Sequence, residues 1–376
     1  MNNQDMFTDK CLPVQELKIK REVCPAKHKL NPDCTYEISE DNLIFGNLLG
    51  QGSFCDVYEV AIKRIDEDQS QDTTPIFPYA VKCLGSRHRT YADRLQVGVK
   101  DLAREANLLK KIRHKNIISF YGATNECLSD LIIPTASGSY SLVIERLHST
   151  LEKQIPIWRE GEKLTTDEDD DRLKPFNRQT TFPRRKSVAL QIARALAHLH
   201  KNGIIYRDLK PENIGFDSKG TVKMFDFGLA KSIVFWKNGE EERSHTPMTG
   251  TLRYMAPEVA FGQNYGPKAD VYSFGILLWQ LFFLQTPFNQ YQDSATFFRN
   301  VFIKEERPII YKNINTTIKM LPVCCWAHEE RRRPNFWRIV QEIEKEVKYV
   351  PLLNKFRQHI SKDNKPSKRL PLKRTQ

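Results

Sequence analysis

The residues between Ile204 and Glu258 constrain the fold of this 376-residue chain more than any other stretch. Two short apolar runs in it each lead into a polar loop. The first loop carries Asp208, Lys210 and Asn213, and the second opens with Asp226. Short apolar runs bounded by polar residues are typical of buried strands. The pattern therefore predicts two strands that deliver two carboxylates, one ammonium group and one amide to the same place.

That set of side chains suits the transfer of a phosphoryl group. The transferred group carries concentrated negative charge, so a protein must position the reactants and neutralise that charge. Asp226 and Asn213 offer the oxygen ligands that Mg²⁺ prefers. Asp208 can accept a hydrogen bond from an attacking hydroxyl group, and Lys210 can reach the same phosphate. Gly228 is expected to let the chain turn sharply after the metal ligand.

The same stretch resembles the catalytic and activation segments of eukaryotic protein kinases. The H-R-D, D-F-G and A-P-E signatures of that family appear as Tyr206–Asp208, Asp226–Gly228 and Ala256–Glu258. The family tolerates a tyrosine in place of the histidine, which plays a packing role. The resemblance covers residues 42–346. It implies an α+β fold of two lobes, a small antiparallel β-sheet lobe with one helix and a larger, mainly helical lobe.

Within this frame the sequence divides into several parts. We expect a basic N-terminal arm at 1–41 that is ordered in part on the small lobe, a small lobe at 42–145, a large lobe at 146–346 with an acidic insertion at about 155–181, and a basic disordered tail at 347–376. We also expect Trp326 and Trp337 to lie in the core of the large lobe.

The small lobe holds the features that resemble an ATP site. A glycine pair between strand residues lets the backbone approach phosphates closely, although Cys55 replaces the third glycine of the family. Lys82 lies on an alternating strand and resembles the lysine that binds the α- and β-phosphates. Glu105, on a predicted helix at 91–113, resembles its paired glutamate. The resemblance implies an ATP site formed by Leu49, Gly50, Gln51, Gly52, Ser53, Phe54, Cys55, Asp56, Val57, Ala80, Lys82, Glu105, Glu145 and Leu147.

Gly215 departs from the family pattern. The family usually has a bulky apolar residue under the adenine at this position. We therefore expect either a roomier floor of the pocket or a shifted Phe216. The backbone of Glu145 and Leu147, in the link between the lobes, is expected to bind the adenine.

The resemblance implies transfer of the ATP γ-phosphate to protein hydroxyl groups. Asp208 and Lys210 would be catalytic, and Asn213 and Asp226 would hold Mg²⁺. Lys210 together with the pair Gly250-Thr251 looks like serine/threonine specificity, since tyrosine-specific members usually lack that lysine. The residues around Thr251 are similar to those of the tyrosine-kinase-like group. The alternative is a pseudokinase that acts as a scaffold or nucleotide sensor, but such proteins usually lack one of these polar residues.

The segment from Leu229 to Met255 resembles the activation loop of the family. Phosphorylation of Thr246 or Thr249 by an upstream kinase would create a partner for an arginine such as Arg207. After the loop, Glu258 is expected to form a buried ion pair with Arg333, with Arg332 as the alternative partner.

The composition of the chain says less about its function than these motifs do. The net charge of +12 is concentrated in the two ends and in short arginine-rich runs, which argues for solvated faces and against nucleic acid as a partner. We see no secretory signal at the N-terminus, and the longest apolar run, residues 275–284, is about half of a membrane span. The eight cysteines are scattered, which indicates reduced thiols and a cytoplasmic location, with the nucleus as the alternative.

Overall fold

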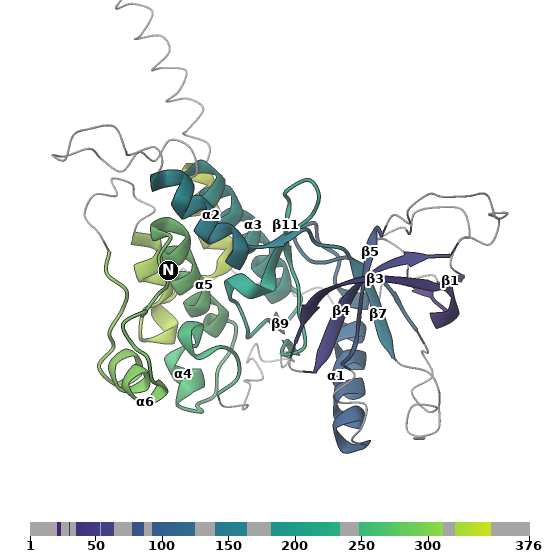
Figure 1. Ribbon diagram of the computed structural model, residues 1–376. Coiled ribbons are helices and arrows are strands. Elements are labelled where there is room, and N and C mark those ends of the chain that lie inside the picture. Colours follow the sequence, from purple (N-terminus) through teal and green to yellow (C-terminus); the bar gives the residue numbers. More distant parts are fainter. Residues whose placement is uncertain are drawn as a thin grey trace, which may run out of the picture.

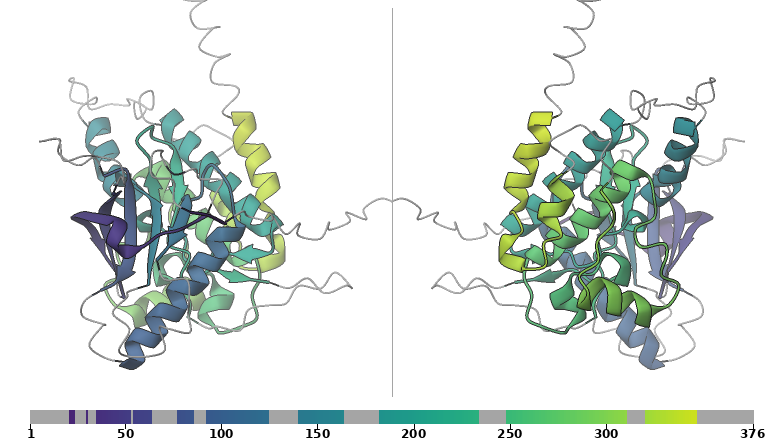
Figure 2. Two further views of the ribbon diagram at one scale, coloured as in Figure 1. Left: turned by 90° about the vertical axis from the view of Figure 1, so that its right-hand side faces the viewer. Right: turned by 90° about the vertical axis from the view of Figure 1, so that its left-hand side faces the viewer.

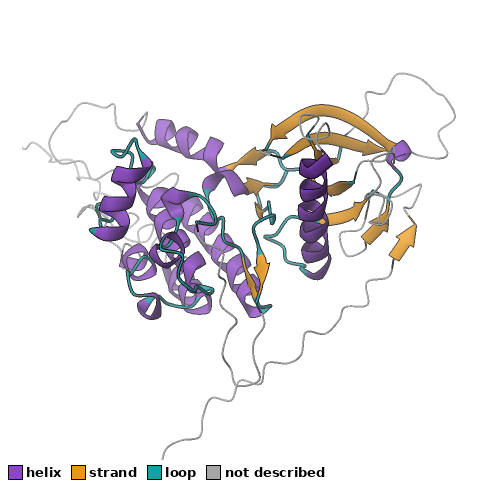
Figure 3. Cartoon of the chain, turned by 90° about the horizontal axis from the view of Figure 1, so that it is seen from below, coloured by secondary structure: helices purple, strands orange, loops and turns teal. Residues whose placement is uncertain are grey.

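The computed structural model describes residues 21–23, 30, 35–52, 54–63, 77–85, 92–124, 140–163, 182–233, 248–310 and 320–346. These residues form two lobes: a sheet with helix α1 makes up one, and most of the helices make up the other (Figure 1). A view from below shows the same division, with the strands and α1 on one side of the molecule and the helical bundle on the other (Figure 3). Ser53, Thr246 and the predicted tail lie outside the described residues.

The small lobe is built on a seven-stranded sheet with the order β1-β2-β6-β7-β5-β4-β3. Its strands are β1 (Arg21–Val23), β2 (Thr35–Glu37), β3 (Leu43–Gln51), β4 (Cys55–Ile62), β5 (Tyr79–Leu84), β6 (Phe120–Ala123) and β7 (Ser141–Glu145). The five strands β3 to β7 pair antiparallel, as predicted, and β1 and β2 extend the sheet in parallel. Helix α1 (Ala92–Lys111) packs against it through buried residues such as Leu102, Ala106 and Leu109. Their spacing of three and four residues places them on one face of the helix.

The N-terminal segment is part of the small-lobe core. Leu30, Tyr36 and Ile38 are almost fully buried in a cluster with residues of the sheet. The approach of the segment to β6 is close, because a Cβ atom added to Gly122 would lie 2.1 Å from the carbonyl oxygen of Tyr36. The described part of the N-terminal arm therefore completes the lobe on the N-terminal side of residue 42.

The large lobe surrounds α5 (Lys268–Phe283), which is apolar and buried over nearly its whole length. The other helical segments are α2 (Leu151–Lys163), α3 (Phe182–Lys201), η4 (Pro211–Asn213), η5 (Leu252–Tyr254), α4 (Pro257–Ala260), α6 (Ser294–Phe297), η6 (Phe298–Ile303), α7 (Leu321–Cys325), η8 (Glu330–Arg332) and a helix at 336–346, and η1 (Glu40–Asn42) precedes β3 in the small lobe. Short strands face the small lobe: β8 (Ser149–Thr150), β9 (Ile204–Ile205), β10 (Ile214–Phe216), β11 (Val222–Met224) and β12 (Lys231–Ser232). Across the described ranges, we find no helix with the length and apolar character that crossing a membrane requires.

Residues 155–163, the first part of the predicted acidic insertion, belong to a helix. Helix α2 continues to Lys163, and Ile155 and Trp158 on it are buried against the core. The polar composition and an internal proline, Pro156, concealed an apolar face formed by residues three and four apart. Residues 164–181, which hold the acidic run, lie outside the described part of the chain.

The prediction for the two tryptophans is half right. Trp326 is buried, but the side chain of Trp337 is 60% exposed. The helix at 336–346 lies at the edge of the large lobe (Figure 2). It turns Phe336, Ile339 and Ile343 inward, so Trp337 faces away from the core.

Candidate active site

The buried carboxylate of Asp270 holds the backbone of the catalytic loop in place. The backbone N–H groups of Tyr206 and Arg207 donate to Asp270 at 2.9 and 2.8 Å. Arg207 adopts a left-handed conformation with φ of 72°, a region that few non-glycine residues occupy. Tyr206 is fully buried, donates its hydroxyl to the carbonyl of Phe225 and packs edge-on against Phe227. The tyrosine therefore fills a packing role.

Asp208 is the centre of a compact polar cluster. Its carboxylate accepts hydrogen bonds from the hydroxyl of Thr251 at 2.8 Å and from the amide of Asn213 at 2.9 Å. The ammonium group of Lys210 lies 2.8 Å from the same carboxylate and donates to Thr251 at 3.0 Å. The amide nitrogen of Asn213 also donates to the backbone carbonyl of Asp208. Since the nitrogen is engaged inside the loop, the amide oxygen is the atom available to a cation.

Lys82 joins the two lobes. Its ammonium group lies 2.7 Å from Glu105 on α1 and 2.9 Å from Asp226, which follows β11. Burial favours the neutral form of Lys82, but the two carboxylates outweigh burial and raise its pKa above the ordinary value. Burial would likewise raise the pKa of Asp226, yet the charge of Lys82 and its hydrogen bond hold that pKa below its usual value. The site therefore keeps one cation and one accessible anion side by side.

The sharp turn after β11 falls at Asp226 itself. Asp226 has a φ of 59°, whereas Gly228, where the sequence suggested the turn, does not have a positive φ. A carboxylate at this turn points toward Lys82. The next backbone N–H, of Phe227, donates to the second oxygen of Glu105 at 3.0 Å. Glu105 thus binds both the lysine, as predicted, and the turn, which the sequence did not indicate.

The predicted nucleotide loop lies between β3 and β4. The N–H of Gly52 donates to the carbonyl of Cys55 at 2.6 Å, which closes the turn. A side chain at Gly50 would meet no atom within 4 Å, so the space beside that backbone is open. Burial raises the pKa of the Cys55 thiol to about 12, and the thiol is therefore unreactive. Asp56, which belongs to the predicted set, is buried next to Gly85.

The link between the lobes carries two ion pairs that the sequence did not indicate. Glu145 lies 2.8 Å from Lys223 on β11 and accepts from the backbone N–H of Ser119 at 3.1 Å. Arg146 pairs with Glu59 on β4 and donates to the carbonyl of Phe77 at 2.8 Å. The pairing partners are far apart in the sequence, and neither pair follows a local motif.

The structure describes the activation segment up to Ile233 and again from Met248 onward. Gly250 has a φ of 99°, and a Cβ added to it would lie 2.4 Å from the carbonyl oxygen of Arg207. The segment therefore lies directly on the catalytic loop, and Gly250 is required there. Thr249 lines a pocket together with Arg207 and Tyr265. Arg207 also donates to the hydroxyl of Tyr265 at 3.2 Å.

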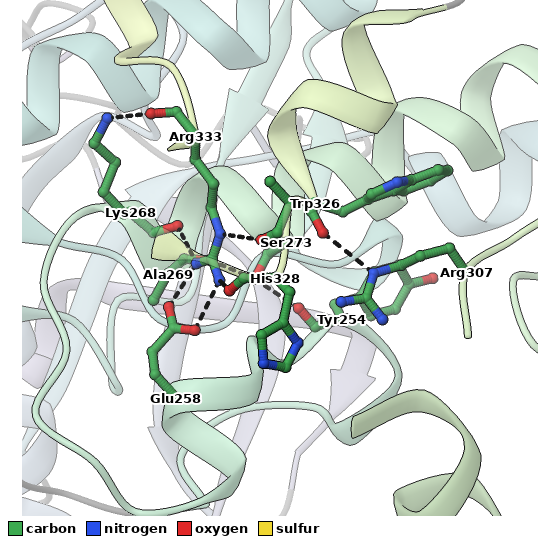
Figure 4. A network of polar contacts seen from close by, with 10 residues as sticks. Tyr254, Glu258, Lys268, Ala269, Ser273, Arg307, Trp326, His328 and Arg333 are labelled. Carbon is green, nitrogen blue, oxygen red and sulfur yellow. Dashed lines mark hydrogen bonds and ion pairs between the residues drawn. The ribbon is translucent and has the colours of Figure 1, made fainter. Parts of the chain in front are cut away.

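A buried ion pair anchors the end of this segment. Arg333 donates to the carboxylate of Glu258 through its two terminal nitrogens, Nη1 and Nη2, at 2.5 and 2.8 Å, and also donates to neighbouring backbone carbonyls (Figure 4). The alternative partner, Arg332, pairs instead with Glu329 on the surface at 2.9 Å.

Comparison with known proteins agrees with this geometry. The family model described as "Protein kinase domain" matches residues 43–343. The chain belongs to the protein kinase family. The recognition from sequence and the predicted two-lobed fold are thereby confirmed.

Kinases of Arabidopsis thaliana and Dictyostelium discoideum are among the similar proteins. The chain is 30% identical to serine/threonine-protein kinase STY46 of Arabidopsis thaliana, over 84% of this chain and 46% of that protein. It is 29% identical to dual specificity protein kinase shkD of Dictyostelium discoideum, over 81% of this chain and 34% of that protein. It is 28% identical to serine/threonine-protein kinase VIK of Arabidopsis thaliana, over 87% and 66% respectively. The chain thus spans less than half the length of the first two relatives.

Proposed function

We propose that the chain is an ATP-dependent serine/threonine protein kinase. The observation that carries the proposal is the contact of Lys82 with both Glu105 and Asp226, which brings the two lobes together at one site. The cluster of Asp208, Lys210 and Thr251 beside it supports transfer to a serine or threonine hydroxyl. The names of the related proteins support the same reaction class.

The residues fit a magnesium nucleotide. The pKa of Asp226 is held below its usual value by Lys82 and its side chain is 46% exposed, and Asn213 uses its amide nitrogen for Asp208, which leaves its amide oxygen for a cation. Mg²⁺ is bound by few protein groups and keeps other oxygen ligands, so one carboxylate and one amide suffice. In the described part of the chain no group of three or more His, Cys, Asp or Glu side chains is arranged to hold a metal ion. When bound, Mg²⁺ would neutralise charge on the phosphates.

Three residues of the chain would bind the phosphates and the attacking hydroxyl group. Lys82 would bind the α- and β-phosphates, because its raised pKa keeps it cationic at every physiological pH. Asp208 would orient the attacking hydroxyl group of the protein substrate and accept its proton as the new bond forms. Lys210, 2.8 Å from Asp208, would place its charge against the γ-phosphate. The effect expected of such positioning and charge stabilisation is large, since the protein does little covalent chemistry in phosphoryl transfer.

Incorporation of the γ-phosphate of ATP into a peptide library tests this proposal, with Asp208→Asn as the control. Asparagine keeps the size of the side chain but cannot accept the proton, so transfer should fall by at least about a hundredfold. Calorimetry with Mg²⁺ and ADP measures binding separately. Nucleotide binding without any transfer by the wild-type chain would favour the scaffold alternative, and absence of binding would contradict the proposal.

Regulation through the activation segment is part of the same proposal. A phosphate on Thr249 or Thr246 would find the guanidinium group of Arg207, since Thr249 and Arg207 line one pocket. The double variant Thr246→Ala/Thr249→Ala should then lose most of its activity after incubation with ATP or an activating kinase. Full activity of that variant would refute this form of regulation. A cytoplasmic location is also proposed, on the basis of the reduced thiols at Cys55, Cys324 and Cys325.

A further inference from the structure

The floor of the proposed base pocket has an unusual composition. Gly215 is the middle residue of β10, and both of its neighbours point into the large lobe. Ile214 and Phe216 are buried in the core, where Phe216 packs edge-on against Trp158. Because successive side chains of a strand point to opposite faces, a side chain at position 215 would point the other way, toward the link between the lobes.

The space on that side is already filled. A Cβ atom added to Gly215 would lie 2.5 Å from Cδ1 of Leu147 and 3.3 Å from Cε1 of Phe225. Contacts under 3.0 Å do not occur between a real Cβ atom and its neighbours, so any side chain at 215 would displace Leu147. The backbone pairing explains the proximity, since Gly215 lies opposite Thr150 on β8 and the N–H of His148 donates to the carbonyl of Phe216.

We propose that the side chain of Leu147, rather than residue 215, forms the floor of the base pocket, and that Gly215 is present to make room for it. Leu147 is partly buried and packs on the same hydrophobic cluster as Val57 on β4 and Ala80 on β5. A flat base would therefore lie between two small-lobe side chains and one residue of the lobe link. This assignment rests on the proposed nucleotide site and adds the residue that determines its shape.

The two positions are complementary, which gives the assignment a strict consequence. Only one leucine fits between β10 and the base, so Gly215→Leu would overpack the site, whereas Leu147→Ala would leave a gap beneath the base. The double variant Leu147→Ala/Gly215→Leu moves the branched side chain from the link to the strand. It should restore the floor.

The experiment is titration calorimetry of the full chain with ADP and Mg²⁺. We expect Gly215→Leu and Leu147→Ala each to weaken binding by about tenfold or more, and the double variant to bind within about threefold of the wild type. Gly215→Ala is measured as well, because its single methyl group already meets Leu147. Gly161→Ala is the matched control, since a Cβ atom at Gly161 on α2 meets nothing within 4 Å. It should bind as the wild type does.

Three results would overturn the assignment: unchanged binding by Gly215→Leu, unchanged binding by Leu147→Ala, or a double variant that binds no better than Gly215→Leu. A second readout separates the floor from general damage. In phosphotransfer assays the single variants should raise the KM for ATP and leave the KM for the peptide unchanged, with thermal unfolding as the check on folding. If the wild-type chain binds no nucleotide, the proposed function fails; if it binds and the variants bind equally well, only the floor assignment fails.

Discussion

Arg333 provides the sharpest test of the forces that hold the activation segment in place. All five N–H groups of its guanidinium find acceptors: two donate to the carboxylate of Glu258, and the others donate to the carbonyls of Ala327, Lys268 and His328. The side chain is fully buried, and Glu258 is only 7% exposed. Arg333→Met therefore removes every one of these donors at once and leaves a carboxylate without a cation in the interior.

The expected loss can be worked out from this geometry. Removal of one partner of a buried ion pair destabilises a protein by about 3–5 kcal/mol, because the other charge stays uncompensated. For a domain of this size each kcal/mol lowers the unfolding temperature by about 2–4 °C, so a fall of roughly 6–15 °C is expected. Arg333→Lys keeps the charge but offers three N–H groups in place of five. It should lie between the wild type and the methionine variant.

Urea unfolding followed by tryptophan fluorescence measures the effect, and the chain supplies its own controls. The side chains of Arg331 and Arg332 are 86% and 71% exposed and pair with Glu329 on the surface. Substitution of either by methionine should change the free energy of unfolding by no more than about 0.5 kcal/mol. The reasoning would be refuted if Arg333→Met lost less than about 1 kcal/mol, or if Arg332→Met lost as much.

Three further outcomes are expected. Gly250→Ala should abolish most phosphotransfer because its Cβ would lie 2.4 Å from the carbonyl oxygen of Arg207 in the catalytic loop. Gly220→Ala, at a residue with a φ of 76° but open space around it, should affect only stability. Equal phosphotransfer by the two variants would contradict this reasoning. Burial lowers the pKa of His114 to about 4, from an ordinary 6.5. The unfolded chain therefore takes up the proton first as the pH falls, so roughly 1–2 kcal/mol of stability present above pH 6.5 should be lost toward pH 4. In urea titrations, His114→Gln should remove this dependence of the free energy of unfolding on pH. Gly122→Ala should lower the unfolding temperature by several degrees, since its Cβ would meet the carbonyl of Tyr36 at 2.1 Å, and an unchanged temperature would show that the N-terminal segment is not held there.

The groups that we propose to be catalytic could be located in the sequence because phosphoryl transfer requires them at short, fixed spacings. Asp208, Lys210 and Asn213 lie within six residues of one another, and the structure gathers them through contacts inside one loop. The partner of Lys82 is distant in sequence, but a strand and a helix of regular periodicity determine which way each side chain points. Chemical need indicated Asp208, Lys210 and Asn213, whereas the roles of Lys82 and Glu105 came from the resemblance to protein kinases.

The rest of the site could not be read in this way, because it depends on contacts between residues with no shared pattern. Nothing in the residue type of Leu147 indicates that it leans against Gly215, and the pair of Arg146 with Glu59 joins positions 87 residues apart. Trp337 was misplaced for a related reason. Its size suggested burial, but the face of its helix is decided by Phe336, Ile339 and Ile343 together.

Two adjacent residues of the lobe link each form an ion pair that joins distant parts of the sequence. Glu145 forms an ion pair with Lys223 in the large lobe, and Arg146 forms one with Glu59 in the small lobe. Consecutive residues therefore bind to opposite lobes. Any rotation of one lobe against the other must then bend the backbone of these residues or break an ion pair. Leu147 follows directly, and its side chain forms the floor that we propose for the base. Lobe orientation and the shape of the base pocket are therefore coupled through three adjacent residues, and a nucleotide that fits the pocket best in one orientation would stabilise that orientation by its difference in affinity.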